Sequence, residues 1–246
     1  IESKSFFKDV CERFVKNKRA MIALVIFLII ALMAIFGPMI SPYSYDGMDT
    51  AIMNQRPSAA HWFGTDRFGR DLFTRVLYGA RISLMVGIVT AVINTIIGVI
   101  YGGIAGYVGG RVDMWMMRLT DILYSIPELL YIILIMLIFG SNVRSIIIGV
   151  CVAGWISMAR MVRSQIITLK EQEFALAAFV LGANSRRILF KHLIVNSLGT
   201  IIVTVTLMIP QAIFMEAFLS FVGVGISAPM ASLGTLAQDA RTYLEI

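Results

Sequence analysis

The stretch from Leu176 to Asn196 gathers basic and titratable side chains around a single glycine, in a chain that is otherwise mostly apolar. Guanidinium and ammonium groups at this density suit an acidic protein surface or lipid phosphates, because a guanidinium donates several hydrogen bonds to one anionic group. The stretch therefore predicts recognition of an anionic partner. Its basic and titratable residues are Arg186, Arg187, Lys191 and His192.

Spacing within this stretch predicts a bent pair of helices. Phe174, Ala177, Ala178 and Leu181 lie three and four positions apart, which places them on one helical face. Gly182 should then end the helix as a C-terminal cap, and Asn184 or Ser185 can cap a second helix. The alanines would let another surface approach closely. An interfacial helix lying on anionic lipid fits the same features equally well.

Three further residues are candidates because they interrupt apolar runs. Glu128 and Glu216 are carboxylates inside such runs, and a lone charge within a bilayer is costly and is usually functional. Pro127 should free a backbone carbonyl and bend its helix, as happens where membrane helices line cavities. We therefore expect Glu216, Glu128 and Pro127 to be functional residues that line a cavity, with Glu216 as a cavity or gate residue.

No enzymatic site is visible. Neither His61 nor His192 lies in a His-Glu-x-x-His pattern, and no Gly-x-Ser-x-Gly elbow occurs. The stretch GTDRFGRD, residues 64–71, has the glycine spacing of a phosphate-binding loop, but Arg70 and Asp71 stand where that loop needs Lys and Ser or Thr. We expect a turn that enters a short helix there, and no catalytic or metal site in this chain.

The composition places these residues in a membrane protein. Apolar residues make up 58% of the chain and charged residues only 15%, well outside the usual range of soluble domains. The net charge of +6 fits cytoplasmic loops better than nucleic-acid binding. Five apolar runs are long enough to cross a bilayer as helices. They cover residues 20–40, 82–106, 116–139, 145–162 and 193–219.

Basic residues before the first run predict an N-terminus in the cytoplasm, by the positive-inside bias. We expect a basic amphipathic cytoplasmic segment at 1–19, a first transmembrane helix at 20–40, an external loop with a short helix at 41–81, and a core domain at 82–246. Alternation places the loop at 163–192 in the cytoplasm. It leaves the end of the chain outside, so we also expect a sixth span of about 20 residues beyond residue 246.

A glycine stripe marks the end of the second apolar run. Gly98, Gly102, Gly106 and Gly110 recur every four residues and leave one helical face bare. Such stripes allow close helix packing in lipid. We favour packing over a pore-lining role for these glycines.

Two stretches resemble a known family. The run FALAAFVLG at 174–182, followed by Ile188 and by KHLIVN ending at Asn196, is similar to the cytoplasmic "EAA" loop of ABC importer permeases. Residues 64–71, the run GARISL at 79–84 and the stretch EAFLSFVGVG at 216–225 resemble the C-type permease subunit of dipeptide, oligopeptide and nickel importers. The likeness covers nearly the whole chain. Leu176 stands where the family usually has Glu or a polar residue, and Val195 where it usually has Pro.

The resemblance implies an all-α, polytopic permease of the MetI-like fold in the cell inner (cytoplasmic) membrane. Peptides are the substrate class that it favours, and nickel complexes or glutathione-like ligands are the alternatives. It implies a paralogous B-type permease, one or two ATPase subunits that carry ATP and magnesium, and an extracellular solute-binding protein. The loop at 163–192 would then be the coupling loop that seats in the ATPase. Its candidate residues are Phe174, Ala175, Ala177, Ala178, Leu181, Gly182, Ser185, Arg186, Arg187 and Ile188. The candidates for the translocation path would be Glu216, Glu128 and Pro127.

Two other classes of function compete with this interpretation. An ion-driven secondary transporter predicts repeated halves and broken helices around a midplane ion site, and we find no convincing repeat. A membrane scaffold without transport would explain the packing glycines, but it would not explain the coupling loop.

Overall fold

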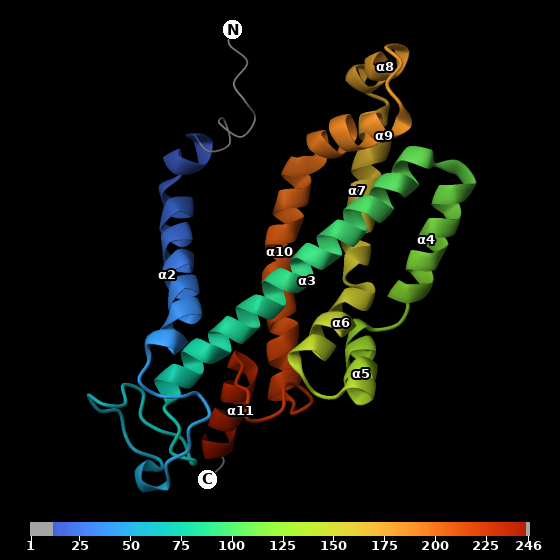
Figure 1. Cartoon of the computed structure of the whole chain (residues 1–246). Helices are drawn as coiled ribbons and strands as arrows, with labels where there is room; N and C mark the ends of the chain where they lie inside the picture. The colour runs from blue at the N-terminus through green and yellow to red at the C-terminus, as the bar shows by residue number, and fades with distance from the viewer. Residues whose placement is uncertain (1–11, 245–246) are drawn as a thin grey trace. The chain divides into compact units, whose positions relative to one another are not determined.

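The computed structural model describes residues 12–244, and their side chains as far as residue 241. Lys4, Lys8 and Cys11 lie outside the described residues. The described chain is almost entirely helical (Figure 1), and its β-structure is an isolated bridge between Thr65 and Asp71. The helices are α2 (Lys18–Ile40), η1 (Thr50–Ile52), α3 (Leu72–Val108), α4 (Gly110–Tyr124), α5 (Glu128–Phe139), α6 (Val143–Ala153), α7 (Trp155–Lys170), α8 (Glu173–Val180), α9 (Ser185–Arg187), η2 (Ile188–Leu193), α10 (Ile194–Phe221) and α11 (Leu233–Leu244).

All of the predicted apolar runs fall on helices. Within residues 12–244, four helical stretches are long and apolar enough to cross a membrane, and α4 with α5 makes a fifth if that bent pair counts as one span. The all-α membrane architecture is therefore confirmed. The second span is longer than predicted, because α3 begins at Leu72 and not at 82, so the short helix expected at the end of the external loop is its first part.

The chain divides into two compact units. One consists of Ile1–Arg81 with Pro229–Ser232, and the other of Ile82–Ala228 with Leu233–Ile246. The second unit contains most of the apolar helices and both candidate sites, so it is the part that positions the functional residues.

Within the first unit, Asp71 starts α3. Its Oδ2 atom accepts hydrogen bonds from the backbone N–H and the hydroxyl of Thr74, both at 2.7 Å, and its Oδ1 lies 2.9 Å from Nδ1 of His61. The turn before it needs glycine: Gly69 has φ +72°, and a Cβ there would lie 1.8 Å from the carbonyl oxygen of Asp49. The predicted turn into a helix is thus confirmed.

Within the second unit, the glycine stripe brings α3 against α7. A Cβ at Gly102 would lie 2.1 Å from the carbonyl oxygen of Ala159, and one at Gly106 would lie 2.7 Å from that of Arg163. The predicted packing role is confirmed for these positions and for Gly98, which meets Met158. It is wrong for Gly110, which begins α4 with φ +57° and meets nothing within 4 Å.

Polar contacts fix the ends of these helices near the loop at 163–192. Lys170 donates to the carbonyl oxygen of Gly106 at 3.2 Å, near the end of α3. Arg163 of α7 donates to both carboxylate oxygens of Asp113 on α4. Because lysine and arginine satisfy helix-end carbonyls and carboxylates here, α4 is held to α7 before it turns back into the apolar region.

Two apolar stretches are interrupted, and a third contains a proline. The axis bends by 73° between α4 and α5, where Pro127 stands, so the predicted bend is confirmed. Tyr131 donates to the carbonyl oxygen of Leu123 at 3.0 Å and so satisfies one group freed by the break. Gly154 separates α6 from α7, which the sequence did not predict, and Pro210 lies inside α10.

The segment after α10 contains α11, which was not predicted. This helix packs closely on α10, since a Cβ at Gly234 would lie 2.4 Å from the carbonyl oxygen of Ala217. The backbone N–H of Ser227 donates to the carbonyl oxygen of Ser141 at 3.2 Å, which ties the segment to the connection between α5 and α6. The sixth span expected beyond residue 246 stays a prediction.

Candidate functional site

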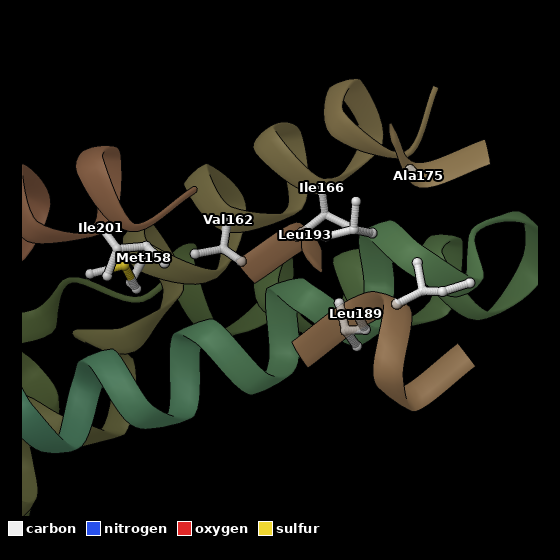
Figure 2. Close-up of a cluster of buried hydrophobic side chains, with 8 residues drawn as sticks. Met158, Val162, Ile166, Ala175, Leu189, Leu193 and Ile201 are labelled. Atoms are coloured by element: carbon white, nitrogen blue, oxygen red, sulfur yellow. The ribbon is translucent and has the colours of Figure 1, made fainter. Parts of the chain in front are cut away.

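The loop that joins α7 to α10 rests on a buried apolar cluster. Met158, Val162 and Ile166 of α7 meet Ala175 of α8 and Ile201 of α10, and the π-helical turn η2 adds further aliphatic side chains (Figure 2). Close packing of this kind resists deformation. The cluster therefore connects the loop mechanically to two apolar helices. The residues from η2 are Ile188, Leu189 and Leu193.

Local capping determines the shape of the loop. The N–H of Ala183 donates to the carbonyl of Ala178, and that of Gly182 to the carbonyl of Phe179, both at 3.0 Å. This is the hydrogen-bond pattern of a Schellman cap, and Gly182 has the left-handed φ of +80° that the cap requires. Asn184 then caps α9 by accepting from the N–H of Arg187 at 2.8 Å. Both predicted caps are confirmed.

The outward face of α8 is strongly apolar. Phe179, Val180 and Leu181 are 69%, 83% and 86% exposed. Of the predicted coupling residues, Ala175 and Ile188 are buried and Ala178 packs against the apolar cluster. The others are exposed: Phe174, Ala177, Leu181, Gly182, Ser185, Arg186 and Arg187.

Sequence reasoning missed Leu176, Phe179 and Val180 as members of this exposed face. Phe179 and Val180 lie three and four residues after Leu176, so the helical spacing was available as a signal. However, α8 is apolar around its circumference, and the spacing alone therefore selects no single outward face.

A cavity of about 840 Å³ lies among the interrupted helices of the second unit. Pro127 and Gly154, one from each interruption, and Pro210 of α10 all contribute to its wall, together with Glu128 and the α3 residue Asn94. Asn94 is 3% exposed and fits because residue 154 is glycine, where a Cβ would lie 2.5 Å from its Nδ2. Two of the predicted path residues, Pro127 and Glu128, thus line one cavity.

Glu216, the third predicted path residue, is not part of that wall. It is fully buried, and its carboxylate accepts hydrogen bonds from the hydroxyls of Ser83 at 2.7 Å and Ser220 at 2.8 Å. A carboxylate with two donors is stabilised where it is buried. The two hydrogen bonds therefore support a structural role for Glu216, and its role as a gate residue stays a prediction.

The geometry of the cavity alone does not settle the class of transporter. Broken helices around a cavity are also what the ion-driven alternative predicts. The exposed apolar end of α8 is what that alternative leaves unexplained. Comparison with known proteins resolves the question.

Residues 97–243 match the family model described as "Binding-protein-dependent transport system inner membrane component", and residues 5–57 match "N-terminal TM domain of oligopeptide transport permease C". The chain is 50% identical to the oligopeptide transport system permease protein OppC of Bacillus subtilis (strain 168), over 98% of this chain and 80% of that protein.

Two further relatives agree with this match. The dipeptide transport system permease protein DppC of the same organism is 50% identical, over 96% of this chain and 74% of that protein. The OppC protein of Escherichia coli (strain K12) is 44% identical, over 100% of this chain and 82% of that protein. The chain therefore belongs to the family of binding-protein-dependent transport system inner membrane components, as a membrane-spanning permease subunit of an ATP-binding-cassette importer.

Proposed function

We propose that the chain is the C-type permease subunit of a peptide importer and forms half of its translocation path. The names of the relatives in Bacillus subtilis and Escherichia coli, which specify oligopeptide or dipeptide transport, support the substrate class. A paralogous B-type permease supplies the other half of the path. ATP and magnesium bind to one or two separate ATPase subunits, and an extracellular solute-binding protein delivers the peptide.

The observation that carries this proposal is the exposed apolar end of α8. An apolar patch of this kind in a polar loop marks a protein or membrane contact. The arginines beside it, Arg186 and Arg187, are exposed as well and favour an acidic rim around an apolar pocket on the ATPase. The loop is thus suited to dock into a groove of a partner subunit.

Coupling requires that the docked loop moves as a rigid body. The buried cluster ties α8 and η2 to α7 and α10, and the cap at Gly182 fixes the angle between the short helices. Movement of the ATPase groove would therefore reach the helices that line the cavity.

The docking face is tested with a pair of identical substitutions. Phe179 and Phe139 are both exposed and lie at or near the C-terminal ends of α8 and α5, so Phe179→Ser and Phe139→Ser remove the same side chain at two different surfaces. We expect Phe179→Ser to weaken association with the ATPase by about tenfold or more, as loss of an interface anchor does, and Phe139→Ser to leave it unchanged. Equal retention of the ATPase during purification would show that α8 is not the docking face.

The loop angle is tested through Gly182. A Cβ at Gly182 meets nothing within 4 Å, so Gly182→Ala acts through the backbone, at about 1–2 kcal/mol for the left-handed conformation. Gly199→Ala is the control, since a Cβ there also meets nothing within 4 Å and its backbone is helical. We expect only Gly182→Ala to reduce the stimulation of ATP hydrolysis by loaded binding protein. Identical stimulation in both variants would contradict a rigid coupling loop.

Transport itself decides between the substrate classes. Proteoliposomes that contain both permeases, the ATPases and the binding protein should accumulate tri-alanine only with ATP. Uptake of a nickel complex or glutathione with no uptake of peptide would redirect the substrate assignment. Uptake that follows an ion gradient without ATP would contradict the importer mechanism.

A further inference from the structure

Glu128 stands in the cavity wall without a partner of opposite charge. The side chain is half-buried at the start of α5, directly after the 73° bend, and it forms no hydrogen bond or ion pair with another residue among 12–241. A carboxylate in an apolar membrane environment is costly unless a cation or hydrogen-bond donors compensate it. The surroundings of Glu128 therefore call for a group that the described chain does not supply.

The rest of the wall lacks a cation as well. No lysine, arginine or histidine is among the described residues that line the cavity, whereas Asn94, Ser157 and Gln211 are polar members of it. Asn94 is almost fully buried, and its Oδ1 atom has no hydrogen-bond donor among the described residues. Buried side-chain acceptors are normally satisfied, so this atom is an exception that calls for an explanation. This oxygen is shielded from the open cavity, so the accessible charged group of the wall that lacks a partner among the described residues is the Glu128 carboxylate.

We propose that Glu128 forms a subsite for the protonated amino group of a solute that passes through the cavity. This inference rests on the proposed peptide-import function. An ammonium carries three N–H donors and one positive charge, which complement a carboxylate. A peptide amino group, with a pKa of about 8, is mostly charged at neutral pH.

A divalent metal ion fits these residues less well. Metal ions take several carboxylate, imidazole or thiolate ligands at once, and no three His, Cys, Asp or Glu side chains gather within residues 12–241. A single carboxylate matches one organic ammonium. The subsite also has no cation for a peptide carboxylate, so it distinguishes the two ends of a peptide.

The test uses three probes that separate these ends: tri-alanine, N-acetyl tri-alanine without the amino charge, and tri-alanine amide without the carboxylate charge. Initial uptake is measured in proteoliposomes of the complete importer with saturating binding protein. Equilibrium dialysis of each probe against the permease–ATPase complex without binding protein gives a second measurement that does not depend on capture. The variants are Glu128→Gln, which removes the charge, and Glu128→Asp, which retains it.

We expect Glu128→Gln to weaken retention of tri-alanine and tri-alanine amide in dialysis by about tenfold, the effect of losing one charge-assisted hydrogen bond. Their uptake should fall in parallel, and retention of the N-acetyl probe should not change. Glu128→Asp should recover most of the loss. If Glu128→Gln affects all three probes equally or none of them, the subsite is wrong, as it is if a basic residue of the second permease pairs with Glu128.

Failure of the subsite and failure of the proposed function give different results. If the wild-type complex does not accumulate tri-alanine with ATP, peptide import itself is wrong. If the wild type accumulates it and Glu128→Gln is indistinguishable from wild type with all probes, peptide import stands and only the amino-group subsite falls.

Discussion

At the scale of single residues, Glu216 joins three parts of the second unit. Its carboxylate accepts from Ser83 of α3 and from Ser220 of α10. Each serine oxygen in turn accepts a backbone N–H, from Leu233 and Ile226 respectively, both at 3.4 Å. The buried charge thus fixes the segment between α10 and α11 to the two long helices, which makes Glu216 a positioning residue for that segment.

We predict that Ser83→Ala and Ser220→Ala each lower the free energy of unfolding by about 1–3 kcal/mol, because each leaves a buried carboxylate with one donor fewer. Thermal unfolding of the purified complex in detergent measures this change. Ser141→Ala is the control, since Ser141 is exposed between α5 and α6 and its contact uses only the backbone oxygen. Unfolding temperatures equal to the control would remove the structural role of Glu216.

The same residues show what sequence could predict and what it could not. The caps at Gly182 and Asn184 follow from their immediate neighbours, because a cap is made within one helical turn. The partner of Glu216 on α3 is 133 positions away in the chain, and no local pattern identifies it. Its place in an apolar run made Glu216 conspicuous in the sequence, but only the fold reveals the two serine hydroxyls that donate to its carboxylate.

At the scale of elements, the two interruptions of the apolar spans differ in how visible they are. Pro127 predicts the bend between α4 and α5, because proline removes a backbone donor and clashes with the preceding turn. Gly154 gives no comparable signal, since its break is associated with the close approach of Asn94 from another helix. The outward face of α8 was equally hidden, because Leu176, Phe179 and Val180 lie in a helix that is apolar all round.

The packing of α3 on α7 gives a prediction with an adjacent control. A Cβ at Gly102 would lie 2.1 Å from a backbone oxygen of α7, whereas a Cβ at Gly103 would meet only side-chain atoms at 3.6 Å or more. We expect Gly102→Ala to force α3 and α7 apart and to destabilise the protein by about 1–3 kcal/mol, as overpacking does.

Thermal unfolding of the two variants, measured side by side, tests this packing. Gly103→Ala should unfold at the wild-type temperature or slightly above it, because alanine is the better helix former. If Gly102→Ala unfolds at the same temperature as Gly103→Ala, the close contact between the two backbones does not exist in the folded protein.

At the scale of the whole molecule, the basic residues before α2 and around α7 to η2 predict which parts face the cytoplasm. Lys16 precedes α2, Lys18 and Arg19 begin it, and Arg186 and Arg187 lie in the loop at 163–192. The segment at 41–81 carries acidic and basic residues together, and a loop of this length has little weight in the positive-inside bias. The N-terminus and the coupling loop should therefore share one side of the membrane, and the segment at 41–81 should lie on the other.

Single cysteines test this orientation. In a Cys11→Ser, Cys151→Ser background, Gln55→Cys and Ser185→Cys place one exposed thiol in each region. A membrane-impermeant maleimide applied to intact cells should label Gln55→Cys, and it should label Ser185→Cys only after the membrane is permeabilised. Labelling of both thiols in intact cells, or of Ser185→Cys alone, would reverse or abolish the assigned topology.

Because Pro127, Gly154 and Pro210 line one cavity, the position of Gly154 within the helical span has a geometrical consequence. The arm of α7 from Trp155 to Lys170 has 16 residues, about 24 Å at 1.5 Å per residue, so a tilt of about 10° about Gly154 carries its far end about 4 Å. Near Gly154 the same tilt moves atoms very little. α3 runs as one helix of 37 residues beside α7. A tilt of α7 about Gly154 would therefore displace the end of α7 next to the loop and leave the cavity wall near Gly154 almost in place.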